Sequence, residues 1–149
     1  DIYAAFLSAE HQKHLSKFQN QTRKLQFILG HLIADNCGNS YTCIAHKDKL
    51  VVVATATDGP IGIDIENTAV QRDFVAISEL MNFTAVKSLD DFYKSFTEYE
   101  ATYKLRTTPK CTRFMRYENY LICVAATKHF EMPQLQYYDT DSILTVKKK

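Results

Sequence analysis

The sequence predicts an α+β fold, because long helical segments alternate with groups of short strand-forming segments. Residues 7–34 have helical periodicity and are followed by β-rich residues up to position 66. Residues 50–55 and 121–127 are two apolar strands, and each has helical material before it and a proline and a further strand after it. This echo indicates two lobes related by a pseudo-twofold axis, although a chance match of two apolar strands explains it almost equally well.

Local signals define the first elements in order. Apolar residues recur at the helical period up to Ile33, and the polar residues 35–39 form a turn. Residues 41–46 and 50–55 are rich in β-branched and aromatic side chains, with a hairpin turn at Lys47 and Asp48. A strand over residues 61–66 and a mixed helical stretch from about 70 to 81 follow.

The second half contains the clearest helix. Ser88 and Asp91 form an acidic capping box at its start, and the residues up to Pro109 close it. Strands are predicted over residues 112–117, 120–127 and, after Pro133, 135–138, and residues 147–149 are a solvated tail.

Composition and charge exclude several classes of function. The chain has 149 residues, 46% hydrophobic and 23% charged, as in one globular domain. Lys and Arg number 18 against 17 Asp and Glu, a net charge of +1, so electrostatics gives no ground for nucleic-acid or membrane binding. The longest aliphatic run, residues 50–54, is far shorter than the roughly 20 residues of a membrane-spanning helix. We expect neither partner.

The cysteines indicate a reducing environment. Cys37, Cys43, Cys111 and Cys123 have no CxxC spacing and no paired histidine, which argues against zinc. The last three lie among strand-forming residues, where buried thiols are common. We expect a cytoplasmic protein, and a disulfide, though possible, has no positive support.

Two acidic residues stand out in the strand at 61–66. Asp64 and Glu66 alternate with Ile61, Ile63 and Ile65, so both carboxylates project from the face opposite the isoleucines. A divalent cation between them would relieve their repulsion, and oxygen ligands favour magnesium over zinc. The alternative, an amphipathic strand with a solvated acidic face, is favoured by the spacing alone.

A third carboxylate lies on the capped helix. At about 100° per residue, Glu100 falls within an apolar arc, whereas Glu98 lies on the opposite face. The arc consists of Leu89, Phe92, Tyr93, Phe96, Tyr99 and Tyr103. A carboxylate on a buried stripe needs a cation or hydrogen-bond donors. Either Lys104 pairs with Glu100 within the helix, which contributes about 0.3–0.5 kcal/mol if exposed, or Glu100 completes a site with Asp64 and Glu66.

These residues resemble the 4′-phosphopantetheinyl transferases, in particular a shortened form of the two-lobed, surfactin-synthetase-activating type. Members carry a G-[IV]-D-[IV]-E strand, as in residues 62–66, and a W-[ST]-x-K-E-[AS]-x-x-K helix, as in residues 96–104. Residues 44–46 are similar to the family's N-[IV]-S-H-S strand, residues 7–30 to its N-terminal helices, and residues 120–125 to its late strand. The resemblance covers nearly the whole chain in the right order.

The resemblance implies a fold and an activity. The chain would be one domain over residues 1–149, with lobe 1 at about 1–66, lobe 2 at about 67–146 and the site in the cleft between them. Each lobe would pack helices on a small, mainly antiparallel sheet, and two lobes in one chain imply a monomer. The activity would transfer 4′-phosphopantetheine from coenzyme A to a serine of an acyl or peptidyl carrier protein, releasing 3′,5′-ADP, for fatty-acid or secondary-metabolite biosynthesis.

The resemblance also implies residue roles. Asp64, Glu66 and Glu100 would ligate Mg²⁺, and Glu100 or a metal-held water would take the serine proton. Lys104 would bind the phosphate and assist the leaving ADP oxygen. His46 would contact the 3′-phosphate, and His11 and His14 would occupy the places of cationic phosphate contacts. Without the resemblance, His46 is explained equally well as a strand-end residue, and His11 and His14 are explained better as solvated side chains.

Some residues depart from the family pattern. Tyr99 stands in place of the lysine before the catalytic glutamate, and Phe96 in place of the tryptophan. Ala45 and Lys47 replace the serines on either side of the histidine, and Gln26 lies where relatives carry a phosphate-binding arginine. The segment between residues 34 and 41 is also shorter than in two-lobed members. These departures favour the alternative of a diverged, non-catalytic module that binds a carrier protein or a nucleotide.

Overall fold

The computed structural model describes residues 4–131 and 135–138 and confirms the α+β class. The helical elements are η1 (Ala4–Phe6), α1 (Ala9–Leu15), α2 (Gln21–Cys37), α3 (Phe74–Leu80) and α4 (Leu89–Leu105). The strands are β1 (Tyr41–Lys47), β2 (Leu50–Ala56), β3 (Ile61–Asn67), β4 (Cys111–Tyr117) and β5 (Tyr120–Ala126).

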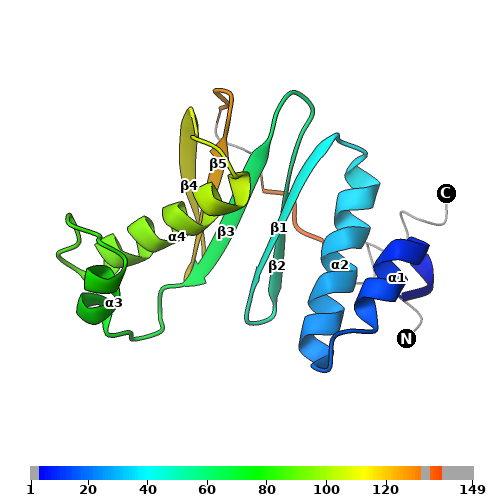
Figure 1. Ribbon diagram of the computed structural model, residues 1–149, viewed down its shortest axis with the longest axis horizontal. Coiled ribbons are helices and arrows are strands. Elements are labelled where there is room, and N and C mark those ends of the chain that lie inside the picture. Colours follow the sequence, from blue (N-terminus) through cyan, green and yellow to red (C-terminus); the bar gives the residue numbers. More distant parts are fainter. Residues whose placement is uncertain (1–3, 132–134, 139–149) are drawn as a thin grey trace.

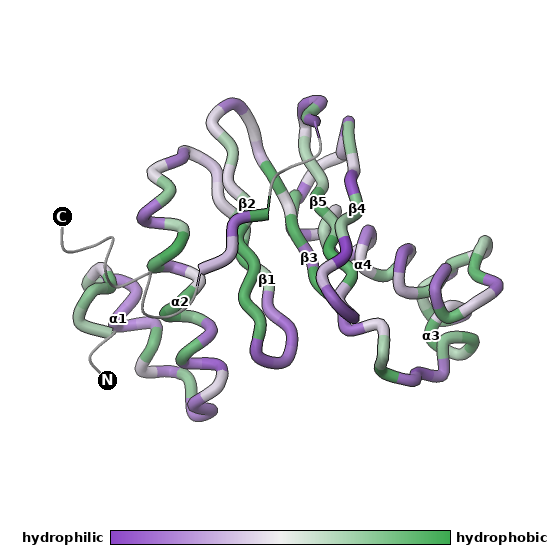
Figure 2. The backbone as a smooth tube through the Cα atoms, turned by 180° about the vertical axis from the view of Figure 1, so that it is seen from behind, coloured by the Kyte–Doolittle hydropathy of each residue, from purple (hydrophilic) through white to green (hydrophobic). Residues whose placement is uncertain are grey.

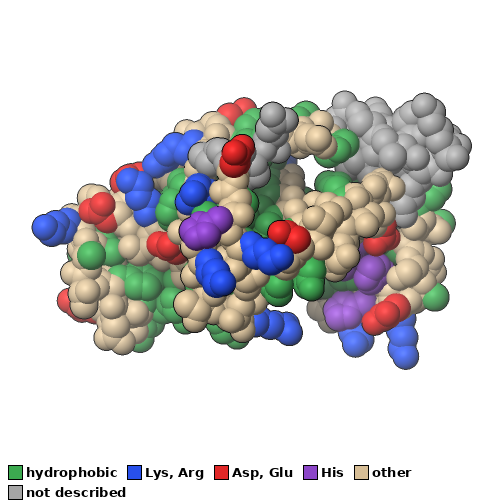
Figure 3. All heavy atoms as spheres, turned by 90° about the horizontal axis from the view of Figure 1, so that it is seen from above, with side chains coloured by type: hydrophobic (Ala, Val, Ile, Leu, Met, Phe, Trp, Pro, Cys, Tyr) green, Lys and Arg blue, Asp and Glu red, His purple; other side chains and the backbone are tan. Residues whose placement is uncertain are grey.

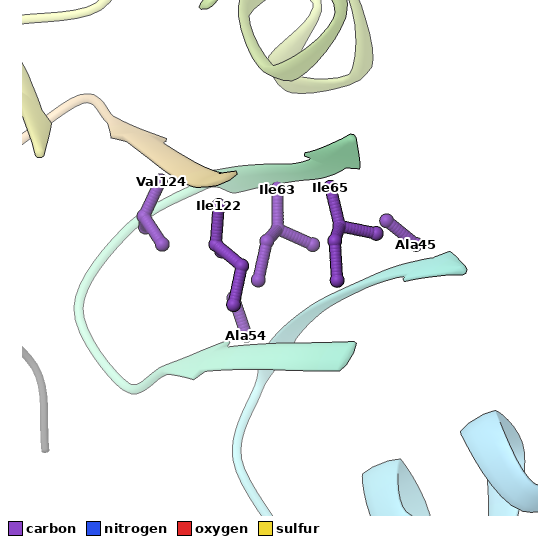
Figure 4. Close-up of a cluster of buried hydrophobic side chains, with 6 residues drawn as sticks. All are labelled: Ala45, Ala54, Ile63, Ile65, Ile122 and Val124. Atoms are coloured by element: carbon purple, nitrogen blue, oxygen red, sulfur yellow. The ribbon is translucent and has the colours of Figure 1, made fainter. Parts of the chain in front are cut away.

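The strands form two small antiparallel sheets that pack against each other. One sheet is the β1–β2 hairpin, and the other has the order β3-β5-β4. Between the sheets lies a core of small and branched side chains (Figure 4): Ala45, Ala54, Ile63, Ile65, Ile122 and Val124. Strands β2 and β3 are largely hydrophobic, and the turn that joins β1 to β2 is hydrophilic (Figure 2).

One helix covers the outer side of each sheet (Figure 1). α2 packs on β1 and β2, with α1 beside it, and α4 packs on β3 and β5, with α3 beside it. Strand alternation makes this possible, because Leu121, Cys123 and Ala125 of β5 face α4 while Ile122 and Val124 face the hairpin. The sheet-on-sheet core therefore has a helix on either side.

The predicted helix over residues 7–34 is two helices. Ser8 caps α1 by accepting from the His11 amide at 3.3 Å, and Asn20 caps α2 by accepting from the Arg23 amide at 3.1 Å. Asn20 has an extended backbone, which ends one helical run and begins the next. Further along, Asp73 caps α3, so this helix starts later than predicted, at Phe74.

The strand predicted over residues 135–138 does not form. These residues have no regular secondary structure, and the side chains of Leu135 and Tyr137 are 54% and 75% exposed. A strand there would have no apolar face to bury, so its alternating pattern carries no packing energy. Pro133 and the tail at residues 147–149 lie outside the described residues.

No helix within residues 4–131 or 135–138 combines the length and the apolar character needed to cross a bilayer.

Candidate functional site

Strand β3 presents Asp64 and Glu66 on one face, as the alternation predicts. Ile63 and Ile65 are buried in the core between the sheets, while Asp64, on the opposite face, pairs with Lys104 of α4. Both are buried, with 7% of each residue exposed. The solvated acidic strand considered from the spacing is therefore not what forms.

Gly62 lets α4 lie directly on β3. A Cβ at this position would be 2.1 Å from the Ala101 carbonyl oxygen and 2.8 Å from the Leu105 amide nitrogen, both backbone atoms of α4. Only glycine permits this approach. The close seating brings Lys104 over the strand, where its Nζ lies 2.7 Å from Asp64 Oδ1.

The helix begins as predicted but is rotated from the predicted face. The Ser88 hydroxyl accepts from the Asp91 amide at 3.1 Å and donates to the Asp91 carboxylate at 2.8 Å. The buried residues of the helix are Phe92, Tyr93, Thr97, Ala101 and Leu105. Tyr99 and Tyr103 are 44% and 71% exposed, so the predicted arc was wrong toward its C-terminal end.

The small residues of α4 explain this rotation. Ala101 packs against Gly62 and the small side chains of β5, whereas a tyrosine cannot fit there. Glu100, next to Ala101, is half-buried at the border of the contact face. Glu98 lies over β4, where its Oε1 accepts from the Thr112 hydroxyl at 2.9 Å, so the prediction from the periodicity that Glu98 lies on the face opposite the contact was wrong.

Asp64 lies in surroundings that disfavour its negative charge. Burial raises its pKa above the ordinary value, and the charges of Glu66 and Glu100 act in the same direction, while Lys104 opposes them. Its Oδ2 is buried and has no hydrogen-bond partner among the residues that the structure describes. Lys104 thus pairs with Asp64 of the strand rather than with Glu100 of its own helix.

Two cations that sequence reasoning did not assign hold Glu66. Lys47 Nζ lies 2.7 Å and Arg72 Nη2 3.2 Å from Glu66 Oε2. Arg72 also lies over the ring of Phe96, 6.0 Å from its centroid. The direction of the Lys47 side chain could be predicted from the sequence. Lys47 directly follows His46 in the strand, so its side chain points to the opposite face of the hairpin. Arg72 lies in a loop, where no periodicity indicates its direction.

Carboxylate oxygens such as those of Asp64, Glu66 and Glu100 are the ligand type that a hard cation prefers. Within residues 4–131 and 135–138, no three His, Cys, Asp or Glu side chains form a ready metal-binding group, and Asp64 and Glu66 are paired with lysine and arginine instead. The unpartnered Asp64 Oδ2 is nevertheless a buried anionic oxygen that needs a positive partner. Carboxylate oxygens of this kind fit Mg²⁺.

His46 projects toward α2 and contacts Arg23. Arg23 Nη1 lies 2.9 Å from His46 Nδ1 and also contacts Nε2. Burial lowers the pKa of His46, and the positive charges of Arg23, Lys104 and Lys47 lower it further. A neutral imidazole nitrogen can accept a hydrogen bond from the Arg23 guanidinium. Lys104, which pairs with Asp64, is one of the positive charges that lower the pKa of His46.

A small pocket of about 110 Å³ adjoins the Arg23–His46 pair. It lies between α2, β1 and the segment after α1, and it is lined by Phe18, Arg23, Gln26, Phe27, His31, Ile44 and His46. His11 and His14 do not line the pocket, but each contacts a residue that does. His14 stacks on Phe27 with centroids 5.4 Å apart, and His11 lies 3.8 Å from His31.

The residues predicted from sequence are thus brought together in two groups. Lys104 of α4 meets Asp64 of β3, with Glu66 on the same face of the strand, and His46 lies with Arg23 beside the pocket, while Glu100 is half-buried on α4. Elsewhere on the surface, basic and acidic side chains intermingle over the face seen in Figure 3, in line with the net charge of +1.

Comparison with known protein families finds no family model that matches this chain, and comparison with proteins of curated function finds no match.

Proposed function

We propose that this protein transfers 4′-phosphopantetheine from coenzyme A to a serine of an acyl or peptidyl carrier protein, with 3′,5′-ADP as the second product. The observation that carries the proposal is the contact of α4 with β3. The Gly-Ile-Asp-Ile-Glu strand and the Glu-x-x-x-Lys helix are distant in sequence, yet Lys104 reaches Asp64 at 2.7 Å and the charge of Glu100 acts on the same carboxylate.

The fold supports a two-lobed arrangement. A helix covers each sheet on its outer side, α2 over the β1–β2 hairpin and α4 over the three-stranded sheet, which is the arrangement expected of two pseudo-twofold-related lobes. Coenzyme A would lie in a cleft between the lobes, with its nucleotide toward Arg23 and His46 and its pyrophosphate toward Lys104. A single chain with both lobes would act as a monomer.

Magnesium would be held by Asp64, Glu66 and Glu100. The unpartnered Asp64 Oδ2 and the like charges that raise the pKa of Asp64 are features that a divalent cation would relieve. When bound, Mg²⁺ neutralises charge that develops on the phosphate oxygens.

The side chains then have separate tasks. The serine oxygen forms a bond to the phosphorus next to pantetheine, the bond from that phosphorus to the bridging oxygen breaks, and Glu100 takes the serine proton. Lys104 leaves Asp64, binds the phosphate and stabilises the charge on the departing 3′,5′-ADP. His46, neutral and held by Arg23, orients the 3′-phosphate and gains a proton more readily beside it.

Two glutamates on one helix allow a matched test. Purified protein is incubated with coenzyme A, Mg²⁺ and an apo carrier protein, and the carrier is weighed intact by mass spectrometry. The carrier should gain one phosphopantetheine with the wild type and with Glu98→Gln, whereas Glu100→Gln should be slower by about 10²-fold or more. No gain with the wild type, across fatty-acid and peptide carriers, would refute the enzyme.

A second candidate function is a non-catalytic module that binds a carrier protein or nucleotide. The favouring observation is that the chain's own cations already hold Glu66 on two sides, with Tyr99 where the family pattern has a lysine. This module would leave the carrier unmodified, and coenzyme A would bind to Glu100→Gln and wild type alike, with no dependence on Mg²⁺.

A further inference from the structure

Two consecutive residues at the turn of the β1–β2 hairpin are tied to two consecutive residues at the end of β3. Lys47 Nζ lies 2.7 Å from Glu66 Oε2, and Asp48 Oδ2 accepts from Asn67 Nδ2 at 2.8 Å. The hairpin and the three-stranded sheet are separate sheets, so side-chain contacts rather than a strand ladder fix how this turn lies against β3. The place of the Lys47 ammonium therefore depends on what holds the neighbouring Asp48.

Asp48 is held from three elements. The Tyr120 hydroxyl of β5 donates to Asp48 Oδ2 at 3.0 Å, beside the bond from Asn67 of β3. Asn67 and Tyr120 are directly opposite each other in the β3–β5 register, which brings both donors to one carboxylate oxygen. From α2, Gln26 Nε2 donates to the Asp48 carbonyl oxygen at 2.8 Å. The bonds from Asn67 and Tyr120 hold the pKa of Asp48 below its ordinary value, so it is a charged acceptor at neutral pH.

Glu66 is the buried carboxylate that the anchored lysine neutralises. Only 7% of the residue is exposed, and Lys47 and Arg72 contact the same oxygen, Oε2, at 2.7 and 3.2 Å. A divalent cation that coordinates Glu66 would lie close to both positive side chains and be repelled by them. Lys47 makes the shorter of the two contacts and belongs to a turn that three elements anchor. It is therefore the nearest competitor of a metal ion at this carboxylate.

We propose that Lys47 is a built-in counter-cation of Glu66 that a divalent metal ion must displace, and that Asp48 is the positioning residue that keeps it there. The inference concerns regulation of the proposed transferase site, and it rests on that proposal for Mg²⁺ as the metal. Lys47 stabilises the buried carboxylate in the metal-free chain and weakens metal binding by the same interaction. Glu66 then changes partner only when the metal concentration is high enough to release the lysine.

The counter-cation is tested with Mn²⁺, whose free ion is measured by electron paramagnetic resonance without any transfer reaction. Lys47→Met should bind Mn²⁺ about 5- to 10-fold more tightly than the wild type, because a positive charge beside the carboxylate is lost while the length of the side chain is kept. Lys49→Met is the matched control. Lys49 is exposed in the same turn, so its removal should change the affinity by less than about 2-fold. If Lys47→Met does not fold, Lys47→Gln removes the same charge and should give the same gain.

Two neutral replacements of Asp48 test the positioning. Its φ of 52° is one that glycine and asparagine adopt, so neither replacement strains the turn. Asp48→Asn keeps a side-chain oxygen that can accept from Asn67 and Tyr120, whereas Asp48→Gly keeps none. Because both remove the same charge, the difference between them measures the anchor alone. Asp48→Gly should bind Mn²⁺ about 2- to 4-fold more tightly than Asp48→Asn, since Lys47 is then less firmly held.

The outcomes separate this inference from the transferase. Equal Mn²⁺ affinity of the wild type and the Lys47 variant, or equal effects of Lys47→Met and Lys49→Met, overturns the counter-cation, even where the carrier protein is modified. Equal affinity of Asp48→Gly and Asp48→Asn overturns the positioning role. Tighter Mn²⁺ binding by the Lys47 variant alone, with no modification of any carrier protein by the wild type, supports the counter-cation and removes the transferase.

Discussion

Replacing Gly62 with alanine tests the seating of α4 on β3, on which the whole site depends. The added Cβ would lie 2.1 Å from the Ala101 carbonyl oxygen, 2.8 Å from the Leu105 amide nitrogen and 3.1 Å from the Leu105 Cβ. All three atoms belong to one turn of the helix, and two of them are backbone. No side-chain rotation relieves the overlap, so the helix itself must move away from the strand.

The expected cost is at the upper end of the range for overpacked cores. Overpacking typically destabilises by about 1–3 kcal/mol, and a backbone contact this close places Gly62→Ala near 3 kcal/mol or above. For a chain of this size, that free energy lowers the melting temperature by roughly 10 °C. Displacement of α4 should also separate Lys104 from Asp64, now 2.7 Å apart, and reduce any transferase rate.

Urea unfolding followed by circular dichroism measures the change, with Gly59→Ala as control. At Gly59 the added Cβ would lie 2.8 Å from the Thr127 hydroxyl, a side-chain atom that can rotate, so the expected cost is below about 1 kcal/mol. The packing argument is refuted if Gly62→Ala and Gly59→Ala unfold at the same urea concentration.

Three further predictions follow from charge and burial. Lys104→Met should destabilise the protein by about 1–2 kcal/mol at pH 7, less than a fully buried pair because Lys104 is 30% exposed, and adding Asp64→Asn should restore most of the loss; a double-mutant cycle without coupling contradicts the pair. Burial, and then the charge of His11, lowers the pKa of His31 below the ordinary 6.5, so the unfolded chain binds this proton first and stability should fall as pH drops from about 7 to 5. His31→Gln should flatten that profile in thermal melts, and an unchanged slope contradicts it. Burial raises the pKa of Cys123 to about 12, so iodoacetamide at pH 8 should label the exposed Cys37 and spare Cys123 in the native protein, as peptide mapping would show; equal labelling contradicts the burial.

Local patterns were sufficient to predict most of the secondary structure. The hairpin around Asp48, the alternation in β3 and the start of α4 at Ser88 each depend on neighbouring residues alone, and each forms as predicted. The strand predicted over residues 135–138 does not form, and Leu135 and Tyr137 remain largely exposed, which no local pattern reveals.

The site could be predicted only in part for the same reason. The periodicity of α4 suggested a face through Tyr99, but the true face is set by the close approach of Ala101 to Gly62, a contact between residues far apart in sequence. Lys47 and Arg72 likewise reach Glu66 from other elements. The acidic residues were recognisable from their alternation, whereas their partners depend on tertiary packing.

A crystal structure with coenzyme A and Mn²⁺ tests the central claim most directly, because manganese substitutes for magnesium and is located by its anomalous signal. We expect one manganese ion coordinated by Asp64, Glu66 and Glu100, with Lys104 moved onto the pyrophosphate. Coenzyme A bound with no ion among these three carboxylates, or with Lys104 still paired to Asp64, would contradict it.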